Sequence, residues 1–473
     1  MKLDAPEAVV EIARKLHQHG FQAWAVGGAV RDALAGRAGG DWDIATDARP
    51  QQVRGLFRRT VPIGIEHGTV GVLAPDGVLY EVTTFRRDVS TDGRHAVVEF
   101  ADSLDDDLAR RDFTINAVAW DPLSGELRDP FGGAADLAAG LLRTVGKPHE
   151  RFAEDRLRVL RALRFAGWFG LRIDDATWTA LVVAARELDH LSAERVREEV
   201  SKVLAGTPVA SMTLDLYARS GSLATWLPEL AATIGMQTPA PAEAVGRRRA
   251  RAAATEPATA DERRDEPAAV ARNDAFGLAL RAADAVSPAR LLLRWTALLH
   301  TTGYPAARTR DLRGGWRYVG HERAGAARTE QVLRRLRFSN ADSERIVRLV
   351  AIQSDLFPPD APDSGIRRWL AHVTRDYIND FFRLRIALWR AYPVERGDRD
   401  LRERWQRARE VLRQRPVLTL DGLAVDGRDL LAAGIEPGPR MGELLRTLLT
   451  RVIEEPALNT KERLLELVRE AVP

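Results

Sequence analysis

Residues 27–43 read GGAVRDALAGRAGGDWD, a glycine pair followed by two aspartates that stand one residue apart. The glycine pair comes directly after the apolar run AWAV at residues 23–26, which has the composition of a short strand. Because glycine has no β-carbon, backbone N–H groups at such a turn can approach a phosphate closely. Arg31 would add a positive charge to that phosphate. The segment therefore predicts a strand that ends in a phosphate-binding turn at Gly27 and Gly28.

The two aspartates, Asp41 and Asp43, indicate a metal site. In an extended strand residues i and i+2 share a face, so the two carboxylates converge, as a magnesium ion requires. A glycine turn alone or an aspartate pair alone is common on protein surfaces. In this order and this close together, the two motifs predict a nucleotide and Mg²⁺ site.

Composition and charge narrow the class of protein. The chain has 473 residues, enough for about three domains, and 45% of them are hydrophobic. Among its 70 basic residues, arginine strongly outnumbers lysine. Arginine suits phosphate recognition, although genomic base composition accounts for most of this bias. The absence of cysteine excludes disulfides, thiolate catalysis and cysteine-ligated zinc.

The sequence contains no apolar run long enough to cross a bilayer, and its first 20 residues lack the apolar core of a signal peptide. We therefore expect a soluble cytoplasmic protein without a membrane partner.

The pattern changes along the chain from mixed α/β to helical. Residues 6–19 have helical spacing, and residues 21–85 contain short β-branched and aromatic runs separated by Gly, Asp and Pro, with a helix at QQVRGLFRR. From residue 150 onward the pattern is helical almost to the end. Residues 238–274 are rich in Ala, Pro and mixed charge, a composition that predicts a disordered insertion.

Three further segments carry candidate metal-binding or substrate-binding groups. Glu81 lies on a predicted strand and is a candidate third metal ligand, the alternative being an edge-strand glutamate that improves solubility. Residues 85–100 predict a loop or loose hairpin that orders when substrate binds. Arg110 and Arg111, before an apolar stretch read as helical, would neutralise charge on a leaving pyrophosphate.

The segment EDRLR at residues 154–158 offers a means to read a base. On a helix, spacing by three lets Asp155 and Arg158 project together. A carboxylate and a guanidinium side by side present an acceptor and donors that can pair with a nucleobase edge. The alternative is an ordinary ion pair on a solvated helix.

Together these motifs closely resemble the bacterial tRNA nucleotidyltransferase and poly(A) polymerase family, in particular CCA-adding enzymes of class II. The resemblance is strong over residues 20–205 and returns at residues 426–467. It rests on GGAVRD, DWD, PIGIEHGTV, EVTTFR, DGRH, RRDFTINA and EDRLRVLRALRFA.

The resemblance implies an α+β architecture: a polymerase-β-type nucleotidyltransferase head followed by all-helical neck, body and tail domains. The expected bounds are 1–145 for the head, 146–237 for the neck, 275–400 for the body and 401–473 for a tRNA-binding tail.

The resemblance also implies roles for the head residues. Asp41 and Asp43 would hold two Mg²⁺ ions. Gly28 and Arg31 would contact the triphosphate of the incoming nucleotide, and Arg111 would bind the same nucleotide.

In the neck, Asp155 and Arg158 would read the base of CTP or ATP, while Arg161 and Arg164 complete the pocket. Residues 88–94 would match the family's flexible loop, which is needed when selection switches from C to A.

One segment departs from the family. Relatives with an HD phosphohydrolase domain carry His-Asp followed by Gly-Lys where this chain has LLHTTGYP, so Thr301 follows His300 and Tyr304 replaces the lysine. A metal ligand is therefore lost. Residues 320–340 still resemble that domain's next helix, which predicts a degenerate HD-like body without phosphohydrolase activity.

The leading functional hypothesis is template-independent addition or repair of the 3′-terminal CCA of tRNA. Its rivals are a poly(A) polymerase, or an enzyme that adds only A or only CC, although the flexible-loop stretch argues against a CC-adder. A catalytically dead RNA-binding protein is a rival of another class, and the joint presence of the carboxylates and base-reading residues argues against it.

Overall fold

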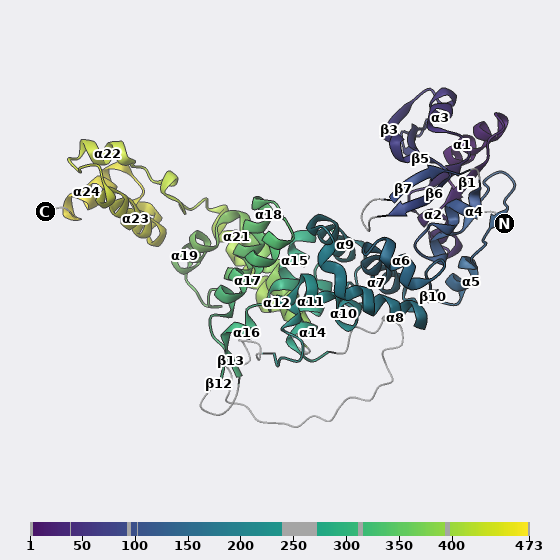
Figure 1. Ribbon diagram of the computed structural model, residues 1–473. Helices are drawn as coiled ribbons and strands as arrows, with labels where there is room; N and C mark the ends of the chain where they lie inside the picture. Colours follow the sequence, from purple (N-terminus) through teal and green to yellow (C-terminus); the bar gives the residue numbers. More distant parts are fainter. Residues whose placement is uncertain are drawn as a thin grey trace. The chain divides into compact units, whose positions relative to one another are not determined.

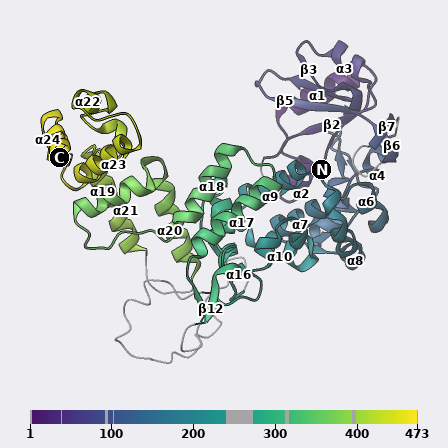
Figure 2. The same cartoon turned by 60° about the vertical axis from the view of Figure 1, so that its left-hand side comes forward.

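A computed structural model describes residues 3–37, 39–91, 96–101, 103–238, 272–310, 316–392 and 398–471 (Figures 1 and 2). The chain divides into two compact units, residues 1–228 and 229–473. The expected disordered insertion at 238–274 falls almost entirely outside the described residues. The finer bounds of head, neck, body and tail stay predictions.

The head in the first unit is built on a seven-stranded sheet with the order β3-β4-β5-β2-β1-β8-β9. These strands are β1 (Ala23–Val26), β2 (Asp43–Thr46), β3 (Thr60–Gly64), β4 (Thr69–Leu73), β5 (Leu79–Thr84), β8 (Ala119–Trp120) and β9 (Leu127–Arg128). The helices of the head are α1 (Glu7–Gln18), α2 (Gly28–Leu34), α3 (Pro50–Leu56), α4 (Leu104–Ala109) and α5 (Gly133–Ala138). The predicted strands and helices are confirmed: β1, β2, β4 and β5 match the predicted strand runs, α1 matches the helix at 6–19, and α3 matches the helix at QQVRGLFRR.

The two faces of the sheet have different environments. Val9, Ile12 and Leu16 of α1 share a buried cluster with Ile44 of β2 and Val82 of β5. On the other face, α4 covers only the region around β1 and β2. Part of that second face is therefore left open.

The segment after Arg111 differs from the expectation. Residues 112–120 form a short 3-10 turn, Thr114–Asn116, and then strand β8, rather than a helix. Pairing of Ala25 with Trp120 and of Val26 with Ala119 extends the sheet beyond β1. Because these ladder hydrogen bonds satisfy the backbone, tertiary pairing overrides the local helical pattern.

The polar segment 85–100 is a hairpin of β6 (Arg86–Thr91) and β7 (Ala96–Phe100), which pair antiparallel. This confirms the alternative of a loose hairpin. Residues 92–95, which include the last three positions of the expected flexible loop at 88–94, lie outside the described residues.

The rest of the first unit is helical, as expected for a neck (Figure 1). A parallel pair of two-residue strands, Leu141–Leu142 and Arg172–Ile173, joins its start to the segment that follows Phe169. The elements are β10 (Leu141–Leu142), α6 (Pro148–Glu154), α7 (Leu157–Phe169), β11 (Arg172–Ile173), α8 (Asp175–Ala184), α9 (Ala193–Gly206), α10 (Ser211–Ser220) and α11 (Ser222–Trp226).

The second unit contains two buried clusters. The larger is formed by α14 (Ala275–Asp284), α15 (Leu291–Leu299), α16 (Tyr304–Ala307), β13 (Trp316–Tyr318), α18 (Asn340–Ile352), α19 (Asp363–Val373), α20 (Ile378–Ala391) and α21 (Arg399–Arg413). The smaller is formed by α22 (Gly427–Ala432), α23 (Pro439–Glu454) and α24 (Lys461–Ala471). The unit also contains α12 (Pro228–Ala231), β12 (Arg308–Arg310) and α17 (His321–Arg335). Helix α17 confirms the helix expected at 320–340.

The segment LLHTTGYP, which the sequence predicts to be a degenerate HD-like remnant, lies inside the second unit. His300 is buried, its Nδ1 is 2.6 Å from the carbonyl oxygen of Ala297, and its ring packs edge-on against Tyr304. Burial lowers the pKa of His300 to about 4, which keeps the ring neutral at physiological pH. Loss of phosphohydrolase activity stays a prediction.

In the part of the chain that the structure describes, no helix combines the length and the apolar character needed to cross a membrane.

Candidate nucleotide-binding and catalytic site

A polar cavity of about 710 Å³ lies between the sheet of the head and helix α7 of the neck, within the first unit. All of the site residues expected from sequence line it: Gly28, Arg31, Asp41, Asp43, Glu81, Arg111, Asp155, Arg158, Arg161 and Arg164. Residues separated by more than 130 positions in sequence thus meet around one space, large enough for a nucleotide-sized ligand.

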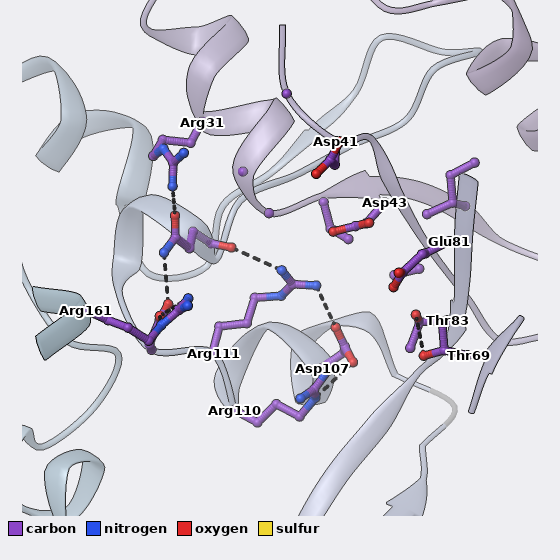
Figure 3. Close-up of a pocket in the computed structure, with 18 of the residues that line it drawn as sticks. Arg31, Asp41, Asp43, Thr69, Glu81, Thr83, Asp107, Arg110, Arg111 and Arg161 are labelled. Carbon is purple, nitrogen blue, oxygen red and sulfur yellow. Dashed lines mark hydrogen bonds and ion pairs between the residues drawn. The ribbon is translucent and has the colours of Figure 1, made fainter. Parts of the chain in front are cut away.

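Three carboxylates stand at one end of this cavity. Strands β2 and β5 are parallel with Ile44 opposite Val82, so Asp43 and Glu81 occupy neighbouring positions on one face. Figure 3 shows Asp41, Asp43 and Glu81 around the same space. Burial, and then the charge of Glu81, raise the pKa of Asp43 to about 6, with a smaller contribution from Asp41. Arg111 opposes this shift, but the net effect leaves the cluster with excess negative charge, which suits a cation.

The donor set fits a hard divalent cation. Among the described residues, no group of three or more His, Cys, Asp or Glu side chains is close enough to hold a metal ion by itself. Magnesium, however, binds to proteins through one or two carboxylates and takes its other ligands from water and substrate phosphates. Asp43 and its carboxylate neighbours meet that requirement, and a cation would relieve the charge that raises the pKa of Asp43.

The glycine turn leaves room beside the carboxylates. Gly27 has a φ of +80°, which favours glycine, and a β-carbon there would stand 3.1 Å from Nη1 of Arg111 and 3.9 Å from Oδ2 of Asp43. Gly28 follows as the first residue of α2. The missing side chains keep the arginine and the carboxylate accessible from the turn.

The arginine pair after α4 is fixed by a buried carboxylate that the sequence analysis missed. Asp107 accepts hydrogen bonds from Nε of Arg110 at 3.1 Å and from Nη2 of Arg111 at 3.2 Å. Burial opposes ionisation of Asp107, but the two arginines outweigh it and lower its pKa. The i,i+3 and i,i+4 spacing in DDLARR is the signal that would have identified it.

A hydrogen-bonded chain links neck to head. Arg161 donates from Nε to Asp112 at 2.8 Å, Asn116 donates to Asp112 at 2.9 Å, and Arg31 donates from Nη1 to Asn116 at 2.7 Å (Figure 3). Asp112 and Asn116 lie in RRDFTINA but were not assigned roles from sequence.

Arg31 is more tightly held than a simple phosphate-binding arginine. Its side chain is buried and donates from Nε to Asp32 at 2.9 Å. Its Cζ atom lies over the rings of Phe165 and Phe169, 5.0 and 4.4 Å from their centroids. It still lines the cavity. Arg31 therefore joins α2 to α7, and its contact with a triphosphate stays a prediction.

The base-reading pair does not lie on one helix, and the spacing argument for it is wrong. Helix α6 ends at Glu154, Asp155 is extended with φ −150° and ψ 109°, and α7 begins at Leu157. The Asp155 carboxylate accepts the backbone N–H of Leu157 at 2.9 Å, so it stabilises the start of α7 instead of continuing the helix. Both side chains of the pair nevertheless line the cavity.

Each member of this pair has its own protein partners. Asp155 accepts from Nη2 of Arg195 at 2.8 Å. Arg158 donates from Nη1 to Glu154 at 2.5 Å and to the carbonyl oxygen of Arg151 at 3.1 Å. Arg158 also donates from Nη2 to the carbonyl oxygen of Arg110 at 3.2 Å, and together these contacts hold the two polar groups in place.

Arg164 is held by a buried ion pair. Its Nε donates to Glu199 of α9 at 2.7 Å, and the two side chains are only 6% and 1% exposed. Burial opposes the charge on Glu199, but Arg164 and Lys202 outweigh it and lower the pKa of this carboxyl. Nothing in local spacing identifies Glu199, because 35 residues separate it from its partner.

The lowered pKa values predict acid sensitivity of the first unit. Asp107, Asp112 and Glu199 all have pKa values below their ordinary ones in the folded chain. In the unfolded chain these carboxyls have pKa values of about 4, so above that pH their stabilising contribution is fully present. It is lost as the pH falls from there toward the lower pKa values of the folded chain. We expect the urea midpoint to fall steeply below about pH 4. In Asp112→Asn, the midpoint at neutral pH should be lower and its fall with acid shallower; an unchanged slope would contradict this origin.

Three family models match separate parts of the chain. The poly(A) polymerase head domain matches residues 23–143, the probable RNA- and SrmB-binding site of polymerase A matches 170–234, and a putative tRNA nucleotidyltransferase domain 2 matches 316–468.

Curated relatives are similar over just under half of the chain. The CCA-adding enzyme of Geobacillus kaustophilus is 46% identical over 230 residues, 48% of this chain and 56% of the relative. That of Enterococcus faecalis is 47% identical over 197 residues, 41% and 48% of the respective chains. The chain spans about half the length of these relatives.

Solved structures match along nearly the whole chain. The Bacillus stearothermophilus CCA-adding enzyme in complex with CTP aligns with a TM-score of 0.69 and 29% identity over 98% of this chain and 97% of that one. The Thermotoga maritima CCA-adding enzyme complexed with tRNA aligns with a TM-score of 0.53 and 18% identity over 98% and 94%, a likeness of fold alone. The α+β architecture expected from sequence is confirmed.

Proposed function

Because the chain belongs to the tRNA nucleotidyltransferase and poly(A) polymerase family, we propose that it adds or repairs the 3′-terminal CCA of tRNA from CTP and ATP. The observation that carries the proposal is one cavity that places a carboxylate cluster and a set of neck side chains around a nucleotide-sized space. Such an enzyme acts in the cytoplasm, where we place this chain.

The carboxylates and arginines of the head supply the chemistry. Asp41 and Asp43, with Glu81 beside them, would hold Mg²⁺, which when bound lowers the pKa of the RNA 3′-hydroxyl and offsets charge on the phosphates. Arg110 and Arg111, which Asp107 holds in place, would offset the negative charge that develops on the departing pyrophosphate. No side-chain nucleophile is needed, since the RNA hydroxyl attacks the α-phosphate directly.

Selection of the base falls to the neck. Asp155 supplies acceptors and Arg158 supplies donors at the cavity wall, so together they can match the polar edge of cytosine or adenine. Arg161 and Arg164, fixed by Asp112 and Glu199, complete the wall. The same side chains recur in every cycle of addition, so the protein itself acts as the template.

Arg158→Ala is expected to blur selection between CTP and ATP more than it weakens phosphate binding. Loss of a bidentate base contact costs about 1–3 kcal/mol of discrimination, which is about tenfold to a hundredfold. The measurement is kcat/KM for each nucleotide on tRNA ending before CCA and after CC. Arg172→Ala, an exposed arginine elsewhere in the neck, is the matched control. Normal discrimination in Arg158→Ala would refute the base-reading role.

The rivals differ in their products. A poly(A) polymerase would extend tRNA with long A tails from ATP alone, and an A-adding enzyme would act only on tRNA ending in CC. A dead RNA-binding protein would incorporate nothing. Incubation of the protein and Mg²⁺ with tRNAs ending before CCA, after C and after CC, each with labelled CTP or labelled ATP, separates all of these. We expect C on the first two substrates and A on the third only.

A further inference from the structure

An aliphatic patch lies uncovered on the head sheet. Val61 and Ile63 of β3 and Leu79 of β5 are 42%, 39% and 41% exposed, although each belongs to a regular strand. A β-carbon at Gly71 of β4, between these strands, would stand 2.5 Å from Cδ1 of Ile63 and 3.0 Å from Cδ1 of Leu79. Gly71 thus lets side chains from two non-adjacent strands meet above the sheet and form a continuous surface.

The patch shares its face with the candidate metal centre. Gly71 pairs with Val61 on one side and with Glu81 on the other, so all three stand on one face of the sheet. Leu79 precedes Glu81 by two positions on β5, and side chains at that spacing lie about 7 Å apart on the same face. The patch therefore begins about one nucleotide's breadth from the carboxylates.

The opposite side of the carboxylates is the side assigned to the incoming nucleotide. On that side stand the glycine turn, Arg111 and the neck residues of the cavity, which the proposed function assigns to the incoming nucleotide. In-line attack on the α-phosphate requires the RNA hydroxyl to enter opposite the leaving pyrophosphate. The face formed by β5, β4 and β3 is the remaining side of the sheet that continues from the carboxylates.

We propose that the aliphatic patch of Val61, Ile63 and Leu79 seats the last nucleotide of the RNA 3′ end. The inference rests on the proposed function and extends it to a site for the acceptor. Aliphatic side chains cover a ribose or the face of a base without offering any hydrogen-bond donor or acceptor. Such a surface accepts RNA ends of different sequence equally, as stepwise addition of C, C and A requires.

The test is the triple variant Val61→Thr, Ile63→Thr and Leu79→Thr. Threonine suits a strand, so the sheet should persist, which circular dichroism melting checks. Loss of the apolar contact area is expected to raise KM for a tRNA ending in CC about tenfold or more. KM for ATP at saturating tRNA should stay within twofold. The control is Val183→Thr with Val319→Thr, two exposed valines outside the head, for which both constants should be unchanged.

A second readout does not depend on turnover. A tRNA that ends in a photoreactive nucleotide, irradiated with the wild-type protein in EDTA, should crosslink to a peptide that contains residues 60–64 or 79–84. Crosslinks confined to other peptides, or an unchanged KM for tRNA in the folded triple variant, would overturn the inference. Failure of the wild-type protein to extend tRNA at all would instead overturn the proposed function, so the two failures are distinguishable.

Discussion

Replacement of Asp43 by asparagine is expected to lower the rate of nucleotide incorporation about a thousandfold or more, since metal-assisted stabilisation of phosphoryl charge contributes several kcal/mol. Asparagine has the same shape but lacks the charge that makes the cluster a cation site. Binding of tRNA, measured by filter retention in EDTA, should change by less than about twofold. A large loss of tRNA binding would mean that Asp43 has a structural role instead.

The same substitution should stabilise the metal-free protein. Burial and Glu81 raise the pKa of Asp43 to about 6 in the folded chain, so between about pH 4 and pH 6 the folded state binds more protons than the unfolded state. Ionisation of Asp43 therefore lowers the free energy of unfolding as the pH rises. This destabilisation is complete above about pH 6. Asp43→Asn removes that destabilisation, about 1–3 kcal/mol at pH 7.5 and close to none at pH 4. Urea unfolding in EDTA at both pH values measures it.

The control for both experiments is Asp47→Asn. Asp47 lies just after β2 and does not line the cavity. The variant should leave incorporation near the wild-type rate. If Asp43→Asn lost activity without any gain in stability at pH 7.5, the uncompensated charge inferred for the cluster would be wrong.

Replacement of Glu199 by alanine is expected to cost about 3–5 kcal/mol of stability, because it leaves the buried guanidinium of Arg164 without its carboxylate. The pair joins α7, which carries Arg158 of the proposed base-reading pair, to α9. The variant should therefore melt at a lower temperature and also select nucleotides less well. Differential scanning calorimetry and the CTP/ATP discrimination assay measure the two effects.

A double variant separates lost charge pairing from lost packing. Arg164→Met with Glu199→Leu replaces the ion pair by apolar groups of similar volume, which is often neutral for stability. It should recover most of the melting temperature but not nucleotide selection, since Arg164 lines the cavity. A cost below about 1 kcal/mol for Glu199→Ala would refute the buried-pair argument.

The strands around Gly27 and Asp43 were predictable because each is a short run of apolar, β-branched or aromatic residues bounded by Gly, Asp or Pro. Nine of the ten site residues that line the cavity were implied by the family resemblance, and the tenth, Glu81, was a candidate from its place on a predicted strand. Local periodicity failed where tertiary contacts decide the backbone: Asp155 breaks the helix to bond Leu157, and residues 119–120 pair with β1. Glu199 was missed because its partner is remote in sequence.

The sequence pattern also hid two properties of correctly placed residues. Arg31 lines the cavity as expected, yet its guanidinium is held by Asp32, Asn116 and two aromatic rings. Such contacts depend on how α2 meets α7, and no local motif encodes that meeting. Burial likewise sets the pKa of Asp43, and the amount of burial follows from the finished fold.

The mass of the product formed on a tRNA that ends before CCA, with CTP, ATP and Mg²⁺ all present, tests the proposed function most directly. Mass spectrometry of the 3′ fragment should show addition of two cytidylates and one adenylate, and then no further growth with time. Oligoadenylate tails, arrest after two cytidylates, or an unextended tRNA would each contradict it.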